Sequence, residues 1–119
     1  MLFRSNIACN FLKKKGFKII ARNHREAHKE IDIIATNREF IAFVEVKTRS
    51  VDDDLYNAYG PPASAVNSSK RANLIEGARA YLRSNPTDKQ PRMDVIEVYL
   101  KKGTNAVLEV NHFEGAYHA

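Results

Sequence analysis

The chain has 119 residues, and we expect it to form one domain over residues 1–119 with its own hydrophobic core. Its single cysteine, Cys9, excludes an internal disulfide and any zinc site built on cysteine pairs. No apolar run approaches the roughly 18 residues of a membrane span and the N-terminus does not resemble a signal peptide, so we expect a soluble, cytoplasmic protein without a membrane partner. The net charge of +5 favours a polyanionic partner, of which nucleic acid is one class.

The first half of the chain predicts one helix followed by three strands. Apolar residues at helical spacing predict an amphipathic helix over about 5–15, with Ser5 as its N-cap and Gly16 as its stop. A polar link at 23–29 and a four-residue polar turn at 36–39 separate three runs that predict antiparallel strands in sequence order, at 17–21, 30–35 and 40–48.

The second half predicts a loop, a helix and a hairpin. Residues 50–62 have loop chemistry and are expected to form a mobile loop, in which Asp52-Asp53-Asp54 is interpreted as a solvated charge run because it lacks the alternating ligands and glycine of a calcium loop. Helical spacing returns over about 68–84, and two alternating runs predict a second hairpin, at 93–101 and 106–112. The tail at 113–119 stays unassigned. The predicted order is α-β-β-β-α-β-β.

Charged side chains interrupt the most apolar of these strands. Alternation places Glu45 and Lys47 on the same face as Ile41 and Phe43, and a solvated face does not normally carry such apolar residues. Burying a carboxylate costs several kcal/mol unless it is paired or holds a metal. The pattern therefore predicts a site, although a charged pair on a strand is also typical of an ion pair at a sheet edge.

Hairpin geometry adds Asp32 to this site. If the turn at 36–39 closes a regular hairpin, Ala35 pairs with Phe40 and Asp32 lies opposite Phe43, diagonal to Glu45. A slip of one residue would send Asp32 to the opposite face. Two carboxylates without a cysteine or histidine cluster suit Mg²⁺ or Mn²⁺ and disfavour zinc. Lys47 would then hold or activate water, or contact a phosphate.

Basic and aromatic residues outside the strands are candidates for contacts to nucleic acid. Arg49 follows the charged strand, and Lys70 and Arg71 stand in the early turns of the second long helix. A solvated helix face is an equal interpretation for Lys70. Tyr56 and Tyr59 are candidate platforms for base stacking.

Two motifs, Glu30-Ile-Asp-Ile-Ile-Ala35 and Phe43-Val-Glu-Val-Lys-Thr-Arg49, resemble the small, uncharacterised bacterial YraN-like proteins and, through them, the PD-(D/E)xK nuclease superfamily. That superfamily includes restriction endonucleases and archaeal Holliday junction resolvases. The resemblance covers most of the chain and includes further matching residues: Ala8 to Leu12, Gly16, Arg22-Asn23, Gly60-Pro61, Lys70, Tyr81-Leu82 and Arg92-Met-Asp-Val95.

The resemblance implies a fold and a set of roles. The fold is α/β with a restriction endonuclease-like core, a central mixed β-sheet flanked by helices. Asp32 and Glu45 are implied metal ligands, with the Val46 carbonyl as a further one, and Lys47 is the implied catalytic lysine. The chain departs from the family where Ser5 replaces an acidic residue of the first helix, and where Lys29 replaces a glycine.

The leading hypothesis is a metal-dependent endonuclease that acts on nucleic acid, on DNA rather than RNA and on branched DNA by analogy. Cutters of branched DNA with a similar fold are dimers, so a homodimer is expected by the same analogy. The alternative is a non-catalytic nucleic-acid-binding module with a degenerate nuclease site. A third interpretation is a protein-interaction domain in which the three charged residues form only a buried ion network.

Overall fold

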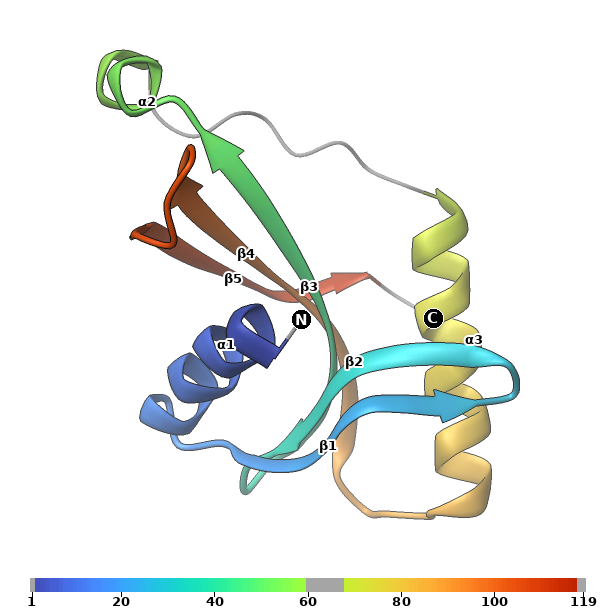
Figure 1. Ribbon diagram of the computed structural model, residues 1–119. Helices are drawn as coiled ribbons and strands as arrows, with labels where there is room; N and C mark the ends of the chain where they lie inside the picture. The colour runs from blue at the N-terminus through green and yellow to red at the C-terminus, as the bar shows by residue number, and fades with distance from the viewer. Residues whose placement is uncertain (1, 60–67, 118–119) are drawn as a thin grey trace.

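The computed structural model describes residues 2–59 and 68–117, without the side chains of Leu2, Tyr59 and Ser68. Its elements are α1 (Leu2–Lys14), β1 (Lys18–Glu26), β2 (Lys29–Thr36), β3 (Phe40–Val51), α2 (Asp53–Tyr59), α3 (Ser68–Ser84), β4 (Gln90–Lys101) and β5 (Val107–Tyr117). The strands form one sheet in the order β1-β2-β3-β4-β5, in which β3 and β4 are parallel and the other neighbours antiparallel (Figure 1). The predicted α/β fold, a mixed sheet flanked by helices, is confirmed and is consistent with a restriction-endonuclease-like core.

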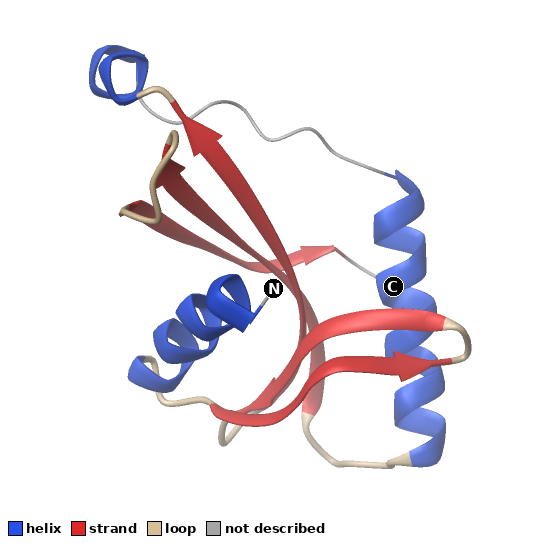
Figure 2. Cartoon of the chain, viewed as in Figure 1, coloured by secondary structure: helices blue, strands red, loops and turns tan. Residues whose placement is uncertain are grey.

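Two apolar clusters hold one long helix on each face of the sheet (Figure 2). On the α1 face, Ala8 and Leu12 pack against residues such as Val44 and Ile96. On the α3 face, the packed residues include Phe43, Leu74, Tyr81, Val95 and Tyr117. Alternation along β3 and β4 assigns successive residues to the two clusters, so the face of each charged residue on these strands follows from its number.

The end of α1 confirms Gly16 as the helix stop. Gly16 has a φ of 93°, its amide donates to the Lys13 carbonyl at 3.0 Å, and the Phe17 amide donates to the Leu12 carbonyl at 3.0 Å. This left-handed ending satisfies carbonyls that the last turn would leave unpaired. The helix begins at Leu2, however, so the prediction of Ser5 as N-cap is wrong: Ser5 lies inside the helix.

Gly16→Ala is expected to lower the free energy of unfolding by about 1 kcal/mol, because alanine resists a left-handed backbone. Apart from Gly16 itself and the two adjacent residues, no described atom lies within 4 Å of an added Cβ, so the cost is conformational rather than steric. Urea unfolding measures it. Asn10→Ala, at an exposed position within α1, is the control and should change stability little. Equal effects of the two substitutions would contradict the capping role.

The predicted polar link at 23–29 is wrong. β1 continues to Glu26 and pairs with Lys29 of β2, so only Ala27 and His28 form the turn. Both have positive φ, 52° and 63°, as a two-residue turn of type I′ requires. The link was predicted because polar side chains interrupt the apolar pattern there, whereas β1 lies at the edge of the sheet and exposes them.

The register of the β2–β3 hairpin differs from the prediction by two residues. Ala35 pairs with Ala42, not Phe40, and Ile34 pairs with Phe43. The Asn37 side-chain oxygen accepts from the Phe40 amide at 2.7 Å and holds a tighter turn than the predicted one. A shift of two residues keeps each paired side chain on its face. Asp32 lies beyond the last pair, and its neighbours Ile31 and Ile33 pack on opposite faces, so parity does not determine the face of Asp32.

The predicted loop at 50–62 is wrong in its described part. β3 continues to Val51, and α2 follows immediately. Asp52 caps this helix, because its Oδ1 accepts from the amides of Asp54 and Leu55 at 2.9 and 3.3 Å. The turn predicted at 60–62 lies outside the described residues. The chain order thus gains a helix and becomes α-β-β-β-α-α-β-β.

The second hairpin is confirmed as the antiparallel pair β4–β5. β4 begins three residues earlier than predicted, and β5 extends through the unassigned tail as far as Tyr117. None of the helices described is both long and apolar enough to cross a membrane.

Candidate functional site

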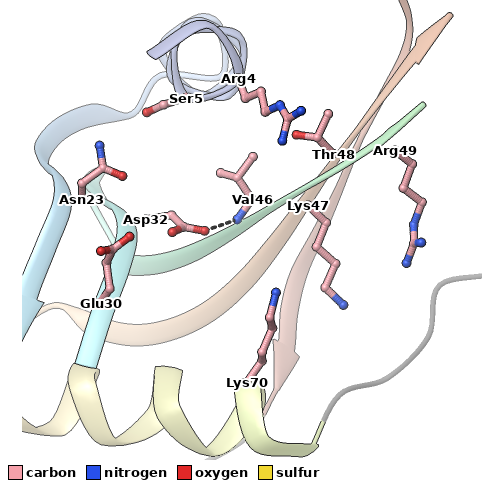
Figure 3. Close-up of a pocket in the computed structure, with 10 residues that line it drawn as sticks. All are labelled: Arg4, Ser5, Asn23, Glu30, Asp32, Val46, Lys47, Thr48, Arg49 and Lys70. Atoms are coloured by element: carbon pink, nitrogen blue, oxygen red, sulfur yellow. Dashed lines mark hydrogen bonds between the residues drawn. The ribbon is translucent and has the colours of Figure 1, made fainter. Parts of the chain in front are cut away.

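The site forms where β2 leaves β3. The ladder between these strands ends at the pair Ile33 and Val44, and its continuation would set Asp32 opposite Glu45. The Asp32 carboxylate instead accepts the Val46 amide at 2.8 Å (Figure 3). The side chain therefore takes the place of a main-chain acceptor of β2, and the local sequence places this carboxylate against β3.

Glu45 is 8% exposed and is contacted from two other elements. Lys70 at the start of α3 places its Nζ 3.7 Å from Glu45 Oε2, and the Tyr117 hydroxyl of β5 lies 3.5 Å from Oε1. The Lys70 side chain is 62% exposed, so solvent weakens its attraction to the carboxylate. Glu45 is thus a nearly buried acid with long contacts on both oxygens.

Negative charge accumulates at Asp32. Burial raises the pKa of its carboxyl group above the usual value of 3.8, and the nearby charges of Glu45 and Glu30 raise it further. The hydrogen bond from Val46 and the charge of Lys70 lower the pKa and offset this only in part. A cation bound between the carboxylates would relieve the repulsion.

Asp32 and Lys47 line one hollow of about 490 Å³ together with side chains from α1, β1, β2 and α3: Arg4, Ser5, Asn23, Glu30, Val46, Thr48, Arg49 and Lys70 (Figure 3). A smaller adjoining hollow of about 290 Å³ includes Glu45 and shares Asp32, Val46 and Lys70 with the first. The structure therefore brings together Asp32, Glu45 and Lys47 around the point where the two strands separate.

The residues predicted to contact nucleic acid divide into two groups. Lys70 and Arg49 line the larger hollow. Arg71 lines neither hollow described here, and its guanidinium carbon lies 4.9 Å from the centre of the Tyr117 ring. The hydroxyl of Tyr56, a candidate stacking platform, donates to Glu109. The side chain of Tyr59 lies outside the described residues.

Sequence reasoning missed Glu97, which neighbours Lys47 on β4. The two are partners in the parallel β3–β4 register and therefore share the α3 face. Glu97 is 1% exposed; the Tyr99 hydroxyl donates to its Oε1, and its Oε2 has no hydrogen-bond partner. A charge within the apolar run 93–100 was the available signal, the same one that identified Glu45.

Ser5 and Asn23 form the α1 side of the larger hollow. Ser5 is 8% exposed and its hydroxyl accepts from Arg22 Nε at 3.0 Å, so the position where an acid was expected does belong to the site. Asn23 lies between the paired residues Arg22 and His24, opposite Asp32, and has a φ of 50°. A left-handed residue within a strand is rare and tends to occur at functional sites.

Asp32 and Glu45 offer two carboxylates as possible ligands for a metal ion. Among the described residues no three His, Cys, Asp or Glu side chains are grouped so that they could hold a metal ion. Mg²⁺ commonly binds one or two carboxylates and keeps waters or substrate phosphates as its other ligands. Asp32 and Glu45, whose repulsion is offset only in part by Lys70 and the Val46 amide, could hold such an ion.

A second buried polar network lies outside both hollows. Asp94 is fully buried and accepts from Arg92 at two atoms, each at 2.9 Å, and from the Gly115 amide at 2.9 Å. His112 Nε2 lies 2.8 Å from the same carboxylate, and Lys15 Nζ lies 2.8 Å from His112 Nδ1. Because the lysine ammonium can only donate, His112 carries its proton on Nε2 and donates to Asp94. The network joins β4 and β5 to the end of α1.

Residues 5–98 match the uncharacterised protein family UPF0102. A UPF0102 protein of Caldanaerobacter subterraneus subsp. tengcongensis is 39% identical over 112 residues, which cover 93% of this chain and 88% of that protein. One from Syntrophotalea carbinolica is 39% identical over 113 residues, covering 94% and 85%. One from Alkaliphilus oremlandii is 40% identical over 114 residues, covering 93% and 91%. The matched region includes the separating strands and all three charged residues.

Proposed function

The chain belongs to the UPF0102 family of uncharacterised bacterial proteins, and we propose that it is a metal-dependent nuclease-like protein that hydrolyses phosphodiester bonds in nucleic acid. One observation carries this proposal: where β2 leaves β3, Asp32 and Lys70 line two adjoining hollows, one of which includes Glu45 and the other Lys47. Metal-assisted phosphodiester hydrolysis requires carboxylates that bind the metal ion, next to positively charged side chains that bind the phosphate. The resemblance to the PD-(D/E)xK superfamily supports the same assignment.

Asp32 and Glu45 would hold Mg²⁺ or Mn²⁺, with the Val46 carbonyl as a further ligand. Because the Val46 amide points at Asp32, and the amide and carbonyl of a strand residue point to the same side, this carbonyl also faces the region of the acids. The bound ion would supply a water of lowered pKa and neutralise charge on the phosphoryl oxygens.

Lys47 is the proposed catalytic lysine. Its side chain lines the same hollow as Asp32, where it would hold or activate the attacking water or contact the phosphate. Glu97 beside it on β4 has an oxygen without a hydrogen-bond partner and favours a cationic neighbour. Lys70, exposed at the start of α3 and shared by both hollows, would contact a phosphate entering from solvent.

We propose DNA rather than RNA as the substrate, in line with the superfamily resemblance. Arg49 and Lys70 extend the positive charge around the hollow, and the chain carries a net charge of +5. Binding through phosphates would make the affinity fall with salt.

The alternative function is a nucleic-acid-binding module without turnover. Ser5 favours it, because it occupies the wall of the hollow where the family resemblance implies a carboxylate. In that case the affinity for nucleic acid would depend on salt, and no combination of Mg²⁺ or Mn²⁺ with branched or linear substrates would yield cleavage.

Lys47→Ala is expected to reduce Mg²⁺-dependent or Mn²⁺-dependent cleavage by about a hundredfold or more, because the lysine acts on the water or the phosphate in the transition state. A panel of linear and branched DNA and RNA substrates measures the rate. Lys102→Ala removes an exposed lysine from the β4–β5 turn and is the matched control. If the Lys47 variant cut as fast as wild type, the cleavage would come from a contaminating nuclease, and the assignment of this protein as a nuclease would be refuted.

A further inference from the structure

The separation of β2 from β3 leaves one edge of β3 open. Among the described residues no strand pairs with β3 on that side beyond Val44, while β4 pairs along the other side as far as Val51. The Val46 amide points toward the open side, and Thr48 presents its main-chain groups in the same direction because strand residues alternate. The Val46 amide already donates to Asp32, so the main-chain donor that this edge adds beside the acids is the Thr48 amide.

Charged and polar side chains lie on both sides of this open edge. Lys47 and Arg49 lie on the α3 face, and alternation puts Thr48 on the α1 face. In Figure 3, Arg4 extends from α1 toward Thr48, whereas Lys47 and Arg49 extend to the other side of the strand. All four nevertheless line one hollow, which wraps around the edge of β3.

Within the described part of the chain, the two arginines of this hollow lack anionic partners. No carboxylate of the described residues forms an ion pair with Arg4 or Arg49, although Glu30 and Asp32 line the same hollow. Arg49 Nε is buried and has no hydrogen-bond partner. By contrast, Arg92 is held by Asp94 at 2.9 Å. A buried guanidinium donor without an acceptor is costly, so Arg49 favours an anion from outside the chain, and the exposed Arg4 lines the same hollow.

We propose that Arg4 and Thr48 form a second phosphate subsite on the α1 side of the open edge, which takes the backbone phosphate next to the scissile one. This inference rests on the proposed function. The scissile phosphate lies with Lys47 and Lys70 on the α3 side, and the nucleic-acid strand crosses the edge of β3 between the two subsites. Arginine matches the geometry of a phosphate with two parallel donors, and the hydroxyl and main-chain amide of Thr48 add the neutral donors that phosphates commonly receive.

The test combines protein variants with neutralised phosphates. Binding to a fluorescein-labelled DNA is followed by fluorescence anisotropy in Ca²⁺, which replaces Mg²⁺ to limit cutting. A series of DNAs carries one uncharged methylphosphonate at successive positions around the cleavage site. The proteins are wild type, Arg4→Gln, Thr48→Val and, as matched control, Arg38→Gln, which removes an exposed arginine from the distant β2–β3 turn. Circular dichroism checks that each variant is folded.

Wild type should lose about tenfold in affinity when one phosphate flanking the scissile position is neutralised. Arg4→Gln should lose a similar factor on unmodified DNA and become insensitive to that methylphosphonate, and its slope of log affinity against log salt should fall by about 0.9 on duplex DNA. Thr48→Val should show a smaller loss at the same position, and Arg38→Gln should behave as wild type.

Failure of the subsite and failure of the proposed function would give different results. If Arg4→Gln keeps the methylphosphonate profile of wild type, or loses no more affinity than Arg38→Gln, the subsite is refuted while the proposed function stands. If wild type neither binds nor cuts any substrate of the panel, the proposed function itself fails, and the subsite fails with it.

Discussion

Asp32→Asn is expected to abolish metal-dependent cleavage and at the same time to raise the free energy of unfolding at neutral pH. Loss of a metal ligand removes several kcal/mol of transition-state stabilisation, which corresponds to more than about a hundredfold in rate. The stability gain has a separate cause. Burial and the charges of Glu45 and Glu30 raise the pKa of Asp32, so its ionised form destabilises the folded protein. Asparagine removes the charge and keeps an oxygen that can accept from Val46.

The difference in stability between wild type and Asp32→Asn should depend on pH in a direction that the raised pKa determines. Below the unfolded pKa, near 3.8, Asp32 is protonated in both states and has no cost. As the pH rises from there through the raised pKa of the folded state, the folded protein loses stability relative to the variant, and the difference then levels off. Thermal unfolding of both proteins across this range measures it. The difference would stay flat if Asp32 had the same pKa in both states.

Magnesium and a matched variant complete the test of Asp32. Mg²⁺ should raise the melting temperature of wild type more than that of Asp32→Asn, because ligands stabilise the state that binds them. Asp88→Asn changes an exposed acid in the loop before β4 and should alter neither cleavage nor the response to Mg²⁺. A lower stability of Asp32→Asn than of wild type would contradict the assignment of this side chain to a destabilised site.

Asp94→Ala is expected to produce the largest loss of stability, about 3 to 5 kcal/mol, because it leaves Arg92 and the nearly buried His112 without their shared carboxylate. That is a large fraction of the roughly 5 to 15 kcal/mol typical of a folded domain. Urea unfolding at neutral pH measures the loss. Asp88→Ala is the control and should change stability by less than about 0.5 kcal/mol.

The contribution of Asp94 should also depend on pH. Burial alone would raise its pKa, but the hydrogen bonds from His112, Arg92 and the Gly115 amide outweigh burial and lower the pKa below 3.8. Its stabilising effect is therefore complete above the unfolded pKa and is lost as the pH falls through the folded value. The gap between wild type and Asp94→Ala should narrow in acid. A gap that widened below pH 3.8 would contradict this linkage.

The charged residues of the candidate site could be predicted because the signals that identify them lie within one strand or one hairpin. Glu45 and Lys47 violate the apolar pattern of one strand, and alternation alone places them on one face. Asp32 was predicted from hairpin parity; the two-residue error in register leaves the faces of the paired residues unchanged because the side-chain period is two, but the ladder ends before Asp32. The family resemblance then supplied the chemistry that parity cannot supply.

The residues that were missed depend on contacts between distant parts of the chain. Glu97 reaches Lys47 only through the parallel β3–β4 ladder, whose register no turn between adjacent strands specifies. Tyr117 reaches Glu45 from a tail without a clear strand pattern. The turn at Ala27 and His28 lacks the asparagine-glycine signature of its type, and the cap at Asp52 was obscured by the acids that follow it.

The open edge of β3 also bears on how the protein stays dispersed in the cell. An unpaired strand edge is a template for pairing with another chain, and natural proteins protect such edges with charged side chains. Here the protecting charges are Lys47 and Arg49, on a strand whose preceding residues are almost wholly apolar. A charge at each of these positions would therefore protect the edge against aggregation independently of any catalytic role.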